Sequence, residues 1–268
     1  MNRRRLLGGV SGSFVLGTAG GAVAGVIGTA AAKFDPVARY TRRSFAVNGE
    51  DVMMANLWVR VKSGAPSYLD IGAYDPIAYS NTYLFYESGG CGVLVEPNPA
   101  RWERLSKMRP RDTLIRAGIG PSETGEADYY MFPNGPQGNT FSKEEADALL
   151  AKYGEKVAAR QVIKMPILDI NRVITEQFRG QTPDLISIDA EGLDLPILRT
   201  LDFQRFRPGM ICSEIECFVP EAGKEILALM QSKGYSVRAR SPQNAIFMDD
   251  HLTLREFSPW SIPDELYA

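Results

Sequence analysis

Acidic residues follow three of the apolar runs in this sequence, at positions that suit the binding of a charged small molecule. Asp70 and Gly72 end the first run, Glu96 follows the second, and Asp189 and Glu191 follow a later one. In an open α/β sheet, ligands bind beyond the carboxyl ends of the strands. If these runs are parallel strands, the four carboxylates therefore meet at one edge of the sheet.

Each carboxylate can do specific chemistry there. Asp70 can attract a cation, and Gly72 lets the backbone turn sharply and approach a ligand. Glu96 can accept both hydroxyls of a ribose. Asp189 and Glu191 can bind a ligand or take a proton from a hydroxyl, which typically contributes ~10²–10⁴-fold to a rate. Plainer interpretations stand beside these: an Asp-x-Gly turn, a helix N-terminal charge and a helix cap.

The turn after Gly72 distinguishes between two nucleotide-type cofactors. The nicotinamide fingerprint G-x-G-x-x-G is absent, because Ala73, Tyr74 and Pro76 stand where glycines would be. A dinucleotide pyrophosphate would favour that glycine-rich cradle, whereas S-adenosylmethionine has no pyrophosphate. A nicotinamide-dependent oxidoreductase is therefore the less favoured of the two interpretations.

Composition excludes some other classes of function. The formal net charge is −2, so no field of the whole chain favours nucleic acid. His251 is the single histidine, which argues against a histidine-rich zinc site and a Ser-His-Asp triad. No residue spacing indicates a metal site, although clustered carboxylates are ligands that Mg²⁺ accepts.

Strand-like and helix-like segments alternate from Ser67 onward, which predicts an α/β fold with a mainly parallel sheet and helices on both faces. An insertion at about 121–166 interrupts this alternation. The expected strands are 68–71, 91–95, 113–117, 184–188, 210–215, 235–238 and 245–248, with 162–166 in the insertion. The expected helices are 51–61, 77–86, 100–107, 193–201 and 221–232, with 142–154 in the insertion.

Four motifs in order resemble the FkbM family of methyltransferases. Asn48–Asp51 resembles the family's opening, and Tyr68–Pro76 with Ser80–Tyr83 resembles its first motif. Val95–Pro99 resembles the second motif, and Asp184–Gly192 resembles the fourth-strand motif. The resemblance covers about residues 44–248.

The resemblance implies a Rossmann-like class I methyltransferase fold with a seven-stranded sheet, and S-adenosylmethionine-dependent methyl transfer, usually to oxygen. It implies that Asp70 and Gly72 line the methionine end of the donor, that Glu96 holds the ribose, and that Asp189 and Glu191 lie near the reacting centre. It also assigns to the donor site Ala73, Tyr74, Asn81, Pro97 and Asn98. The expected acceptor is a hydroxyl of a glycan, a small molecule or a lipid, covered by the insertion around 132–141.

The N-terminal segment differs in composition from the rest of the chain. Arg3, Arg4 and Arg5 precede an uncharged, Gly- and Ala-rich stretch over 6–32 that is long enough to cross a bilayer as a helix. A signal sequence, a membrane anchor and a flexible tail remain alternatives. We therefore divide the chain into a signal-like or anchor segment (1–32), a lead-in (33–66) and a methyltransferase domain (67–268).

The location that the N-terminus predicts for the catalytic domain conflicts with the supply of its methyl donor. The arginines favour the cytoplasmic side, so one full span would carry the rest of the chain away from a donor made in the cytosol. We expect membrane association or targeting through residues 6–32, with the catalytic domain facing the cytoplasm that contains the donor. The alternative is a membrane-tethered binding protein on a degenerate methyltransferase fold.

Overall fold

The structure is a computed structural model that describes residues 42–121, 125–132, 138–154, 160–215 and 220–254. The signal or anchor expected over residues 1–32 and the first part of the lead-in, residues 33–41, lie outside these ranges. Among the helices that are described, none combines the length and the apolar character needed to cross a membrane.

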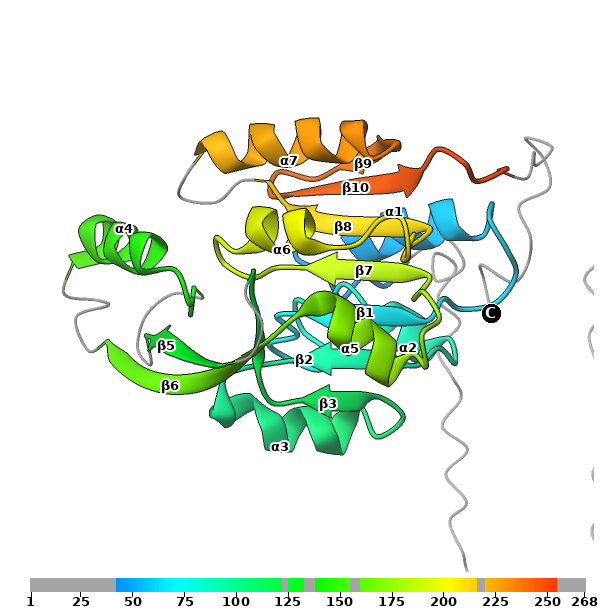
Figure 1. Cartoon of the computed structure of the whole chain (residues 1–268). Helices are drawn as coiled ribbons and strands as arrows, with labels where there is room; N and C mark the ends of the chain where they lie inside the picture. Colours follow the sequence, from blue (N-terminus) through cyan, green and yellow to red (C-terminus); the bar gives the residue numbers. More distant parts are fainter. Residues whose placement is uncertain (1–41, 122–124, 133–137, 155–159, 216–219, 255–268) are drawn as a thin grey trace, which may run out of the picture. The chain divides into compact units, whose positions relative to one another are not determined.

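Seven strands form the main sheet in the order β3-β2-β1-β7-β8-β10-β9 (Figure 1). The pairs from β3 through β8 are parallel, and β10 is antiparallel to both of its neighbours. This confirms the predicted seven-stranded, mainly parallel sheet. The strands are β1 (Tyr68–Ile71), β2 (Gly92–Val95), β3 (Thr113–Ile115), β7 (Leu185–Ile188), β8 (Met210–Glu214), β9 (Tyr235–Arg240) and β10 (Asn244–Asp249).

Helices cover both faces of the sheet, as two separate apolar clusters show. One cluster joins residues of α1 (Glu50–Trp58), α2 (Tyr83–Glu87) and α3 (Pro99–Met108) to strand residues of one face. The other joins α5 (Ile170–Gln177), α6 (Asp194–Thr200) and α7 (Pro220–Ser232) to the opposite face. Leu69 and Ile71 of β1 belong to this second cluster and Tyr68 to the first, as the alternation of side chains along a strand requires.

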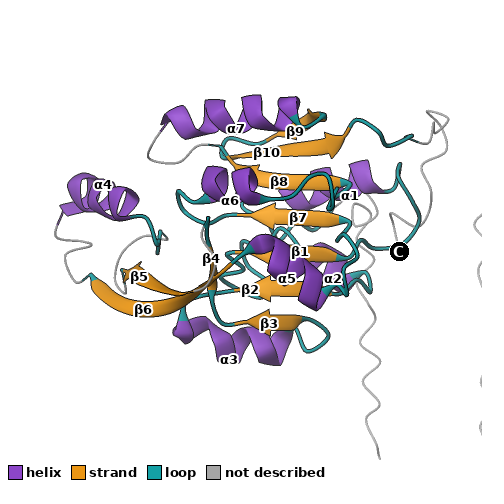
Figure 2. Cartoon of the chain, in the orientation of Figure 1, coloured by secondary structure: helices purple, strands orange, loops and turns teal. Residues whose placement is uncertain are grey.

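The insertion forms a small sheet of its own. Strands β4 (Gly118–Ile119), β6 (Gln161–Leu168) and β5 (Gly125–Met131) pair in the order β4-β6-β5, and α4 (Lys143–Tyr153) follows β5 (Figure 2). The Ser142 side chain caps α4 by accepting from the amide of Glu145 at 3.2 Å. The carboxyl ends of the parallel strands in the main sheet point toward this insertion (Figure 1).

Two local differences from the sequence prediction have clear causes. The helix predicted over 77–86 begins only at Tyr83, because Asp75 Oδ1 accepts from the amides of Ile77 and Ala78 and Tyr79 has φ +63°. An Asx turn of this kind offers the backbone an alternative to a helix. Helix α5 was not expected, although Asp169 caps it and apolar residues follow at helical spacing.

The strand order places a crevice beside β1. The chain leaves β1 toward β2 on one side and later returns to β7 on the other. Ligands in open α/β sheets bind at such a switch point, beyond the carboxyl ends of the strands.

Candidate active site

Three strand ends meet at Gly72. The amide of Gly72 donates to the carbonyl of Val95 at 3.0 Å, and the amide of Asp189 donates to the carbonyl of Ile71 at 3.0 Å. Gly72 has φ +83°, and a Cβ placed on it would lie 1.9 Å from the carbonyl oxygen of Asp189. Only a glycine therefore lets the β1 and β7 loops approach this closely.

Glu96 fastens the loops after β1 and β2 to each other. Its Oε2 accepts from the amide of Tyr74 at 2.7 Å, and its Oε1 accepts from the amide of Asn98 at 2.6 Å. Burial raises the pKa of Glu96 to about 7, against the effect of these two bonds. Each carboxylate oxygen has a second lone pair, so Glu96 can still accept two more hydrogen bonds from a ligand.

Asn98 in turn prepares the helix that follows. Its side chain accepts from the amide of Ala100 at 3.0 Å and caps α3. The cap fixes the entry of α3 beside the tip of β2, and therefore places the first turn of α3 at the carboxyl edge of the sheet.

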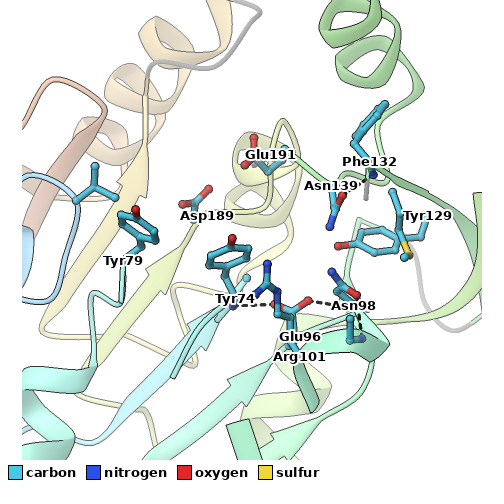
Figure 3. A pocket seen from close by; sticks show the side chains of 15 residues that line it. Tyr74, Tyr79, Glu96, Asn98, Arg101, Tyr129, Phe132, Asn139, Asp189 and Glu191 are labelled. Atoms are coloured by element: carbon cyan, nitrogen blue, oxygen red, sulfur yellow. Dashed lines mark hydrogen bonds between the residues drawn. The ribbon is translucent and has the colours of Figure 1, made fainter. Parts of the chain in front are cut away.

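A cavity of about 340 Å³ lies at this edge. Small-molecule sites typically measure roughly 300–1,000 Å³. Residues from the β1, β2 and β7 loops line one part of it, and Tyr129, Met131, Phe132, Gly138 and Asn139 of the insertion line another (Figure 3). Described residues of the insertion therefore help to line the cavity at the strand tips, within and beside the stretch 132–141 that the sequence analysis placed over the acceptor.

Asp189 and Glu191 line the cavity and lie close to Glu214 at the end of β8. Carboxylate oxygens of the three residues lie within 4.8 Å of one another. Asp189 is exposed to the open cavity, but desolvation by the surrounding protein and the nearby charge of Asp70 raise its pKa to about 6. Burial and acidic neighbours also raise the pKa of Glu191 and Glu214, and Glu214 Oε2 has no hydrogen-bond partner. The cluster can attract a cation or accept a proton.

The insertion is tied to the loop that carries Glu191. Thr140 Oγ1 donates to the carbonyl of Glu191 at 2.6 Å. Glu191 has φ +48° and Gly192 φ +95°, so the backbone turns back immediately after the acidic pair. A Cβ on Gly192 would meet the side chain of Glu145 in α4 at 2.4 Å. The turn holds Glu191 in the cavity wall near Asp189 (Figure 3).

The structure brings six of the predicted site residues to the cavity wall. These are Gly72, Tyr74, Glu96, Asn98, Asp189 and Glu191. The other four do not line it: Asp70, Ala73, Asn81 and Pro97. Asp70 is 5% exposed, and its Oδ2 accepts from Thr82 Oγ1 at 2.5 Å. Asn81 donates to Ser187 Oγ at 3.1 Å.

Tyr74 and Arg101 form one wall of the cavity. Tyr74 has φ +48°, a left-handed backbone conformation that glycine adopts more readily than other residues. The Arg101 guanidinium lies 3.9 Å from the centre of the Tyr74 ring, and its Nε has no hydrogen-bond partner. Among the described residues that line the cavity, Arg101 is the one that carries a positive charge.

Sequence reasoning missed Arg101, Tyr79 and Val47 as cavity residues, whereas Asn139 falls within the stretch 132–141 that was expected over the acceptor. The position of Arg101 in the cavity could have been predicted from the sequence, since this residue lies in the first turn of the helix that follows Glu96. Val47 comes from the lead-in, and nothing in its local sequence connects it to the strand tips.

The family model of the Methyltransferase FkbM domain matches residues 70–237, which is more than half of the chain. No curated protein matches the sequence.

Several solved methyltransferase structures resemble the chain distantly. The precorrin-6y C5,15-methyltransferase of Geobacter metallireducens is 14% identical, with a TM-score of 0.40, covering 78% of this chain and 92% of that one. The 1,6-didemethyltoxoflavin-N1-methyltransferase of Burkholderia thailandensis, solved with its substrate and S-adenosylhomocysteine, is 13% identical, with a TM-score of 0.39, covering 75% and 76%. Aeropyrum pernix fibrillarin, solved with S-adenosylmethionine, is 14% identical, with a TM-score of 0.36, covering 78% and 82%.

Proposed function

The chain belongs to the FkbM methyltransferase family, and from this we propose that it methylates a hydroxyl oxygen of a sugar or another small-molecule or lipid acceptor. Its methyl donor is S-adenosylmethionine. The family assignment leaves the nicotinamide-dependent alternative without support. One observation carries the proposal for oxygen as the acceptor atom: Asp189 and Glu191 stand together in the cavity, where a hydroxyl proton can be taken.

The residues of the cavity fit the donor. S-adenosylmethionine supplies a methyl group activated by a positively charged sulfur. Glu96, Asp189 and Glu191 line the cavity, so its lining is predominantly acidic, and a cationic ligand is favoured wherever these carboxyl groups are ionised. Glu96 retains acceptor capacity for a ribose, and we assign it that role. We assign Gly72 and Tyr74 to the wall along the donor, with Asn98 beyond the ribose and Asp70 behind the methionine end.

Asp189 is our candidate for the general base. Its pKa of about 6 lies near neutral pH, where a general base is both largely ionised and basic enough to act. A carboxylate oxygen of Glu191 lies within 4.8 Å of one of Asp189, so the charge of Glu191 would strengthen the basicity of Asp189. The remaining contribution is alignment of the two substrates, which can supply up to ~7–11 kcal/mol.

We place the acceptor between this acidic pair and the insertion. Tyr129 and Phe132 line the cavity on the insertion side, and Tyr79 lies on the opposite side, next to Asp189 (Figure 3). Aromatic rings suit the apolar face of a sugar or a flat ring.

Product analysis tests this proposal. The full chain is incubated with isotope-labelled S-adenosylmethionine and fractionated small-molecule and lipid extracts, and the labelled product is identified by NMR. We expect a methoxy group, and a loss of ~10²–10⁴-fold in rate for Asp189→Asn. Asp250→Asn, an exposed surface change, is the matched control. A label on nitrogen or carbon, or full activity in Asp189→Asn, would contradict the proposal.

A further inference from the structure

A fully buried arginine lies behind the cavity. Arg109 ends α3 and is 1% exposed. Its Nε donates to Asp112 Oδ2 at 2.7 Å, its Nη1 to the carbonyl of Pro76 at 3.1 Å, and its Nη2 to Tyr68 Oη at 3.0 Å and Thr82 Oγ1 at 3.1 Å. Asp112 balances the charge of Arg109, so the pair can stay ionised without water.

Thr82 connects this arginine to Asp70. Arginine only donates hydrogen bonds, and a hydroxyl has one proton to give. Because Thr82 Oγ1 accepts from Arg109, its own proton goes to Asp70 Oδ2, which lies 2.5 Å away. The direction of the relay is therefore fixed from Arg109 through Thr82 to Asp70. A hydroxyl polarised at both ends by charged groups makes stronger hydrogen bonds than a neutral one.

The position of Thr82 supports a dedicated role for its hydroxyl. Thr82 is the N-cap residue of α2, where a threonine side chain usually accepts from a helix amide. It makes no such bond here. The hydroxyl turns instead to Asp70, and the side chain is fully buried.

The charge of Asp70 reaches the cavity although its side chain does not line it. Asp70 lies two residues before Gly72, and its charge contributes to the raised pKa of Asp189 in the cavity. The same arginine also holds the carbonyl of Pro76 at the end of the loop that begins at Gly72. Arg109 thus fixes a carboxylate and a loop that both face the methionine end of the donor as assigned above.

We propose that Thr82 is a positioning residue. Its hydroxyl links Arg109 to Asp70, keeps the Asp70 carboxylate in place and thereby determines the affinity for the amino-acid end of the donor. This rests on the proposed placement of the donor. The role is specific to one end of the ligand, because Glu96 and Asn98 at the ribose end have no bond to Thr82 or Arg109 among the described contacts.

Two ligands separate this role from a merely structural one. S-adenosylhomocysteine carries the amino-acid group, whereas 5′-methylthioadenosine has the same nucleoside and lacks it. We expect Thr82→Val to weaken S-adenosylhomocysteine about tenfold or more by titration calorimetry, and to leave 5′-methylthioadenosine within about twofold. Thr82→Ser keeps the hydroxyl and should restore wild-type affinity for both.

The results of these titrations distinguish the positioning role of Thr82 from the proposed function of the protein. Equal losses for both ligands, or no loss for either, would overturn the positioning role while leaving the proposed function standing. Failure of the folded wild-type chain to bind S-adenosylhomocysteine would overturn the proposed function itself. Thr82→Ala is measured in parallel, so that poor folding of the valine variant leaves the test intact, and thermal unfolding verifies that each variant is folded.

Discussion

Gly72 can be tested by adding a single carbon to it. In Gly72→Ala the new Cβ would lie 1.9 Å from the carbonyl oxygen of Asp189 and would sit on a backbone with φ +83°. Contacts between a carbon and a carbonyl oxygen normally lie near ~3.3–3.6 Å. The loops after β1 and β7 must therefore separate, and the bond from the Asp189 amide to the Ile71 carbonyl is the nearest one to be strained.

Gly64→Ala is the matched control for this change. Gly64 has nearly the same backbone, φ +84°, but a Cβ on it meets nothing within 4 Å. An alanine in this conformation costs roughly 1–2 kcal/mol at either site. Overpacking adds about 1–3 kcal/mol at Gly72, and a weakened hydrogen bond adds about 0.5–1.5 kcal/mol. We therefore expect Gly72→Ala to be about 1.5–4.5 kcal/mol less stable than Gly64→Ala.

Urea unfolding gives the free energy of unfolding for both variants, and calorimetry gives their affinity for S-adenosylhomocysteine. Gly72→Ala should lose stability and at least tenfold in affinity, because Asp189 and the Gly72 turn move together. Gly64→Ala should bind like the wild type. Equal stability and equal affinity in the two variants would refute the argument that close approach of these loops builds the site.

Three further predictions concern the acidic residues. Glu96→Gln replaces one of the two carboxylate oxygens that accept from backbone amides by an NH₂ donor, so we expect the unfolding free energy to fall by about 1.5–3 kcal/mol. The exposed control Glu103→Gln should change it by no more than about 0.5 kcal/mol. Equal effects of the two substitutions would exclude the role of Glu96 in joining the two loops. Because the pKa values of Glu96 and Asp189 are raised to about 7 and about 6, donor affinity should rise as pH increases from about 5 to 8. Without donor, these two carboxyls stabilise the fold most below their unfolded pKa values, and this contribution should fall as pH rises through 6 and 7. Donor affinity that is flat with pH would contradict these assignments.

The sequence predicts the strands of the main sheet well, because each is a short apolar run between turn signals. The expected strand Tyr68–Ile71 agrees with β1 at both ends. Its end also predicts the edge of the sheet where Gly72, Glu96 and Asp189 meet, since parallel strands end together. The small sheet of the insertion was not predicted as a sheet, because most positions of β5 and β6 are partly exposed and give no regular apolar pattern.

The connections between side chains could not be predicted from the sequence. Arg109 contacts Pro76 and Thr82 from far along the chain, and only the folded packing of α2 and α3 on β1 brings them together. Glu96 was predicted as a ligand of the ribose, but its bonds to the Tyr74 and Asn98 amides depend on how two loops pack. Local sequence predicts where a residue lies along a strand or helix. The hydrogen-bond partners of Arg109 and Glu96 depend instead on the tertiary fold.

Binding of S-adenosylhomocysteine to the full chain tests the central claim most directly. We expect titration calorimetry to show binding by the wild type, and its loss or strong reduction in Asp70→Ala and Glu96→Ala, with both variants shown to be folded. Absence of binding by the folded wild type, or unchanged binding in both variants, would contradict the placement of the donor at the ends of β1, β2 and β7.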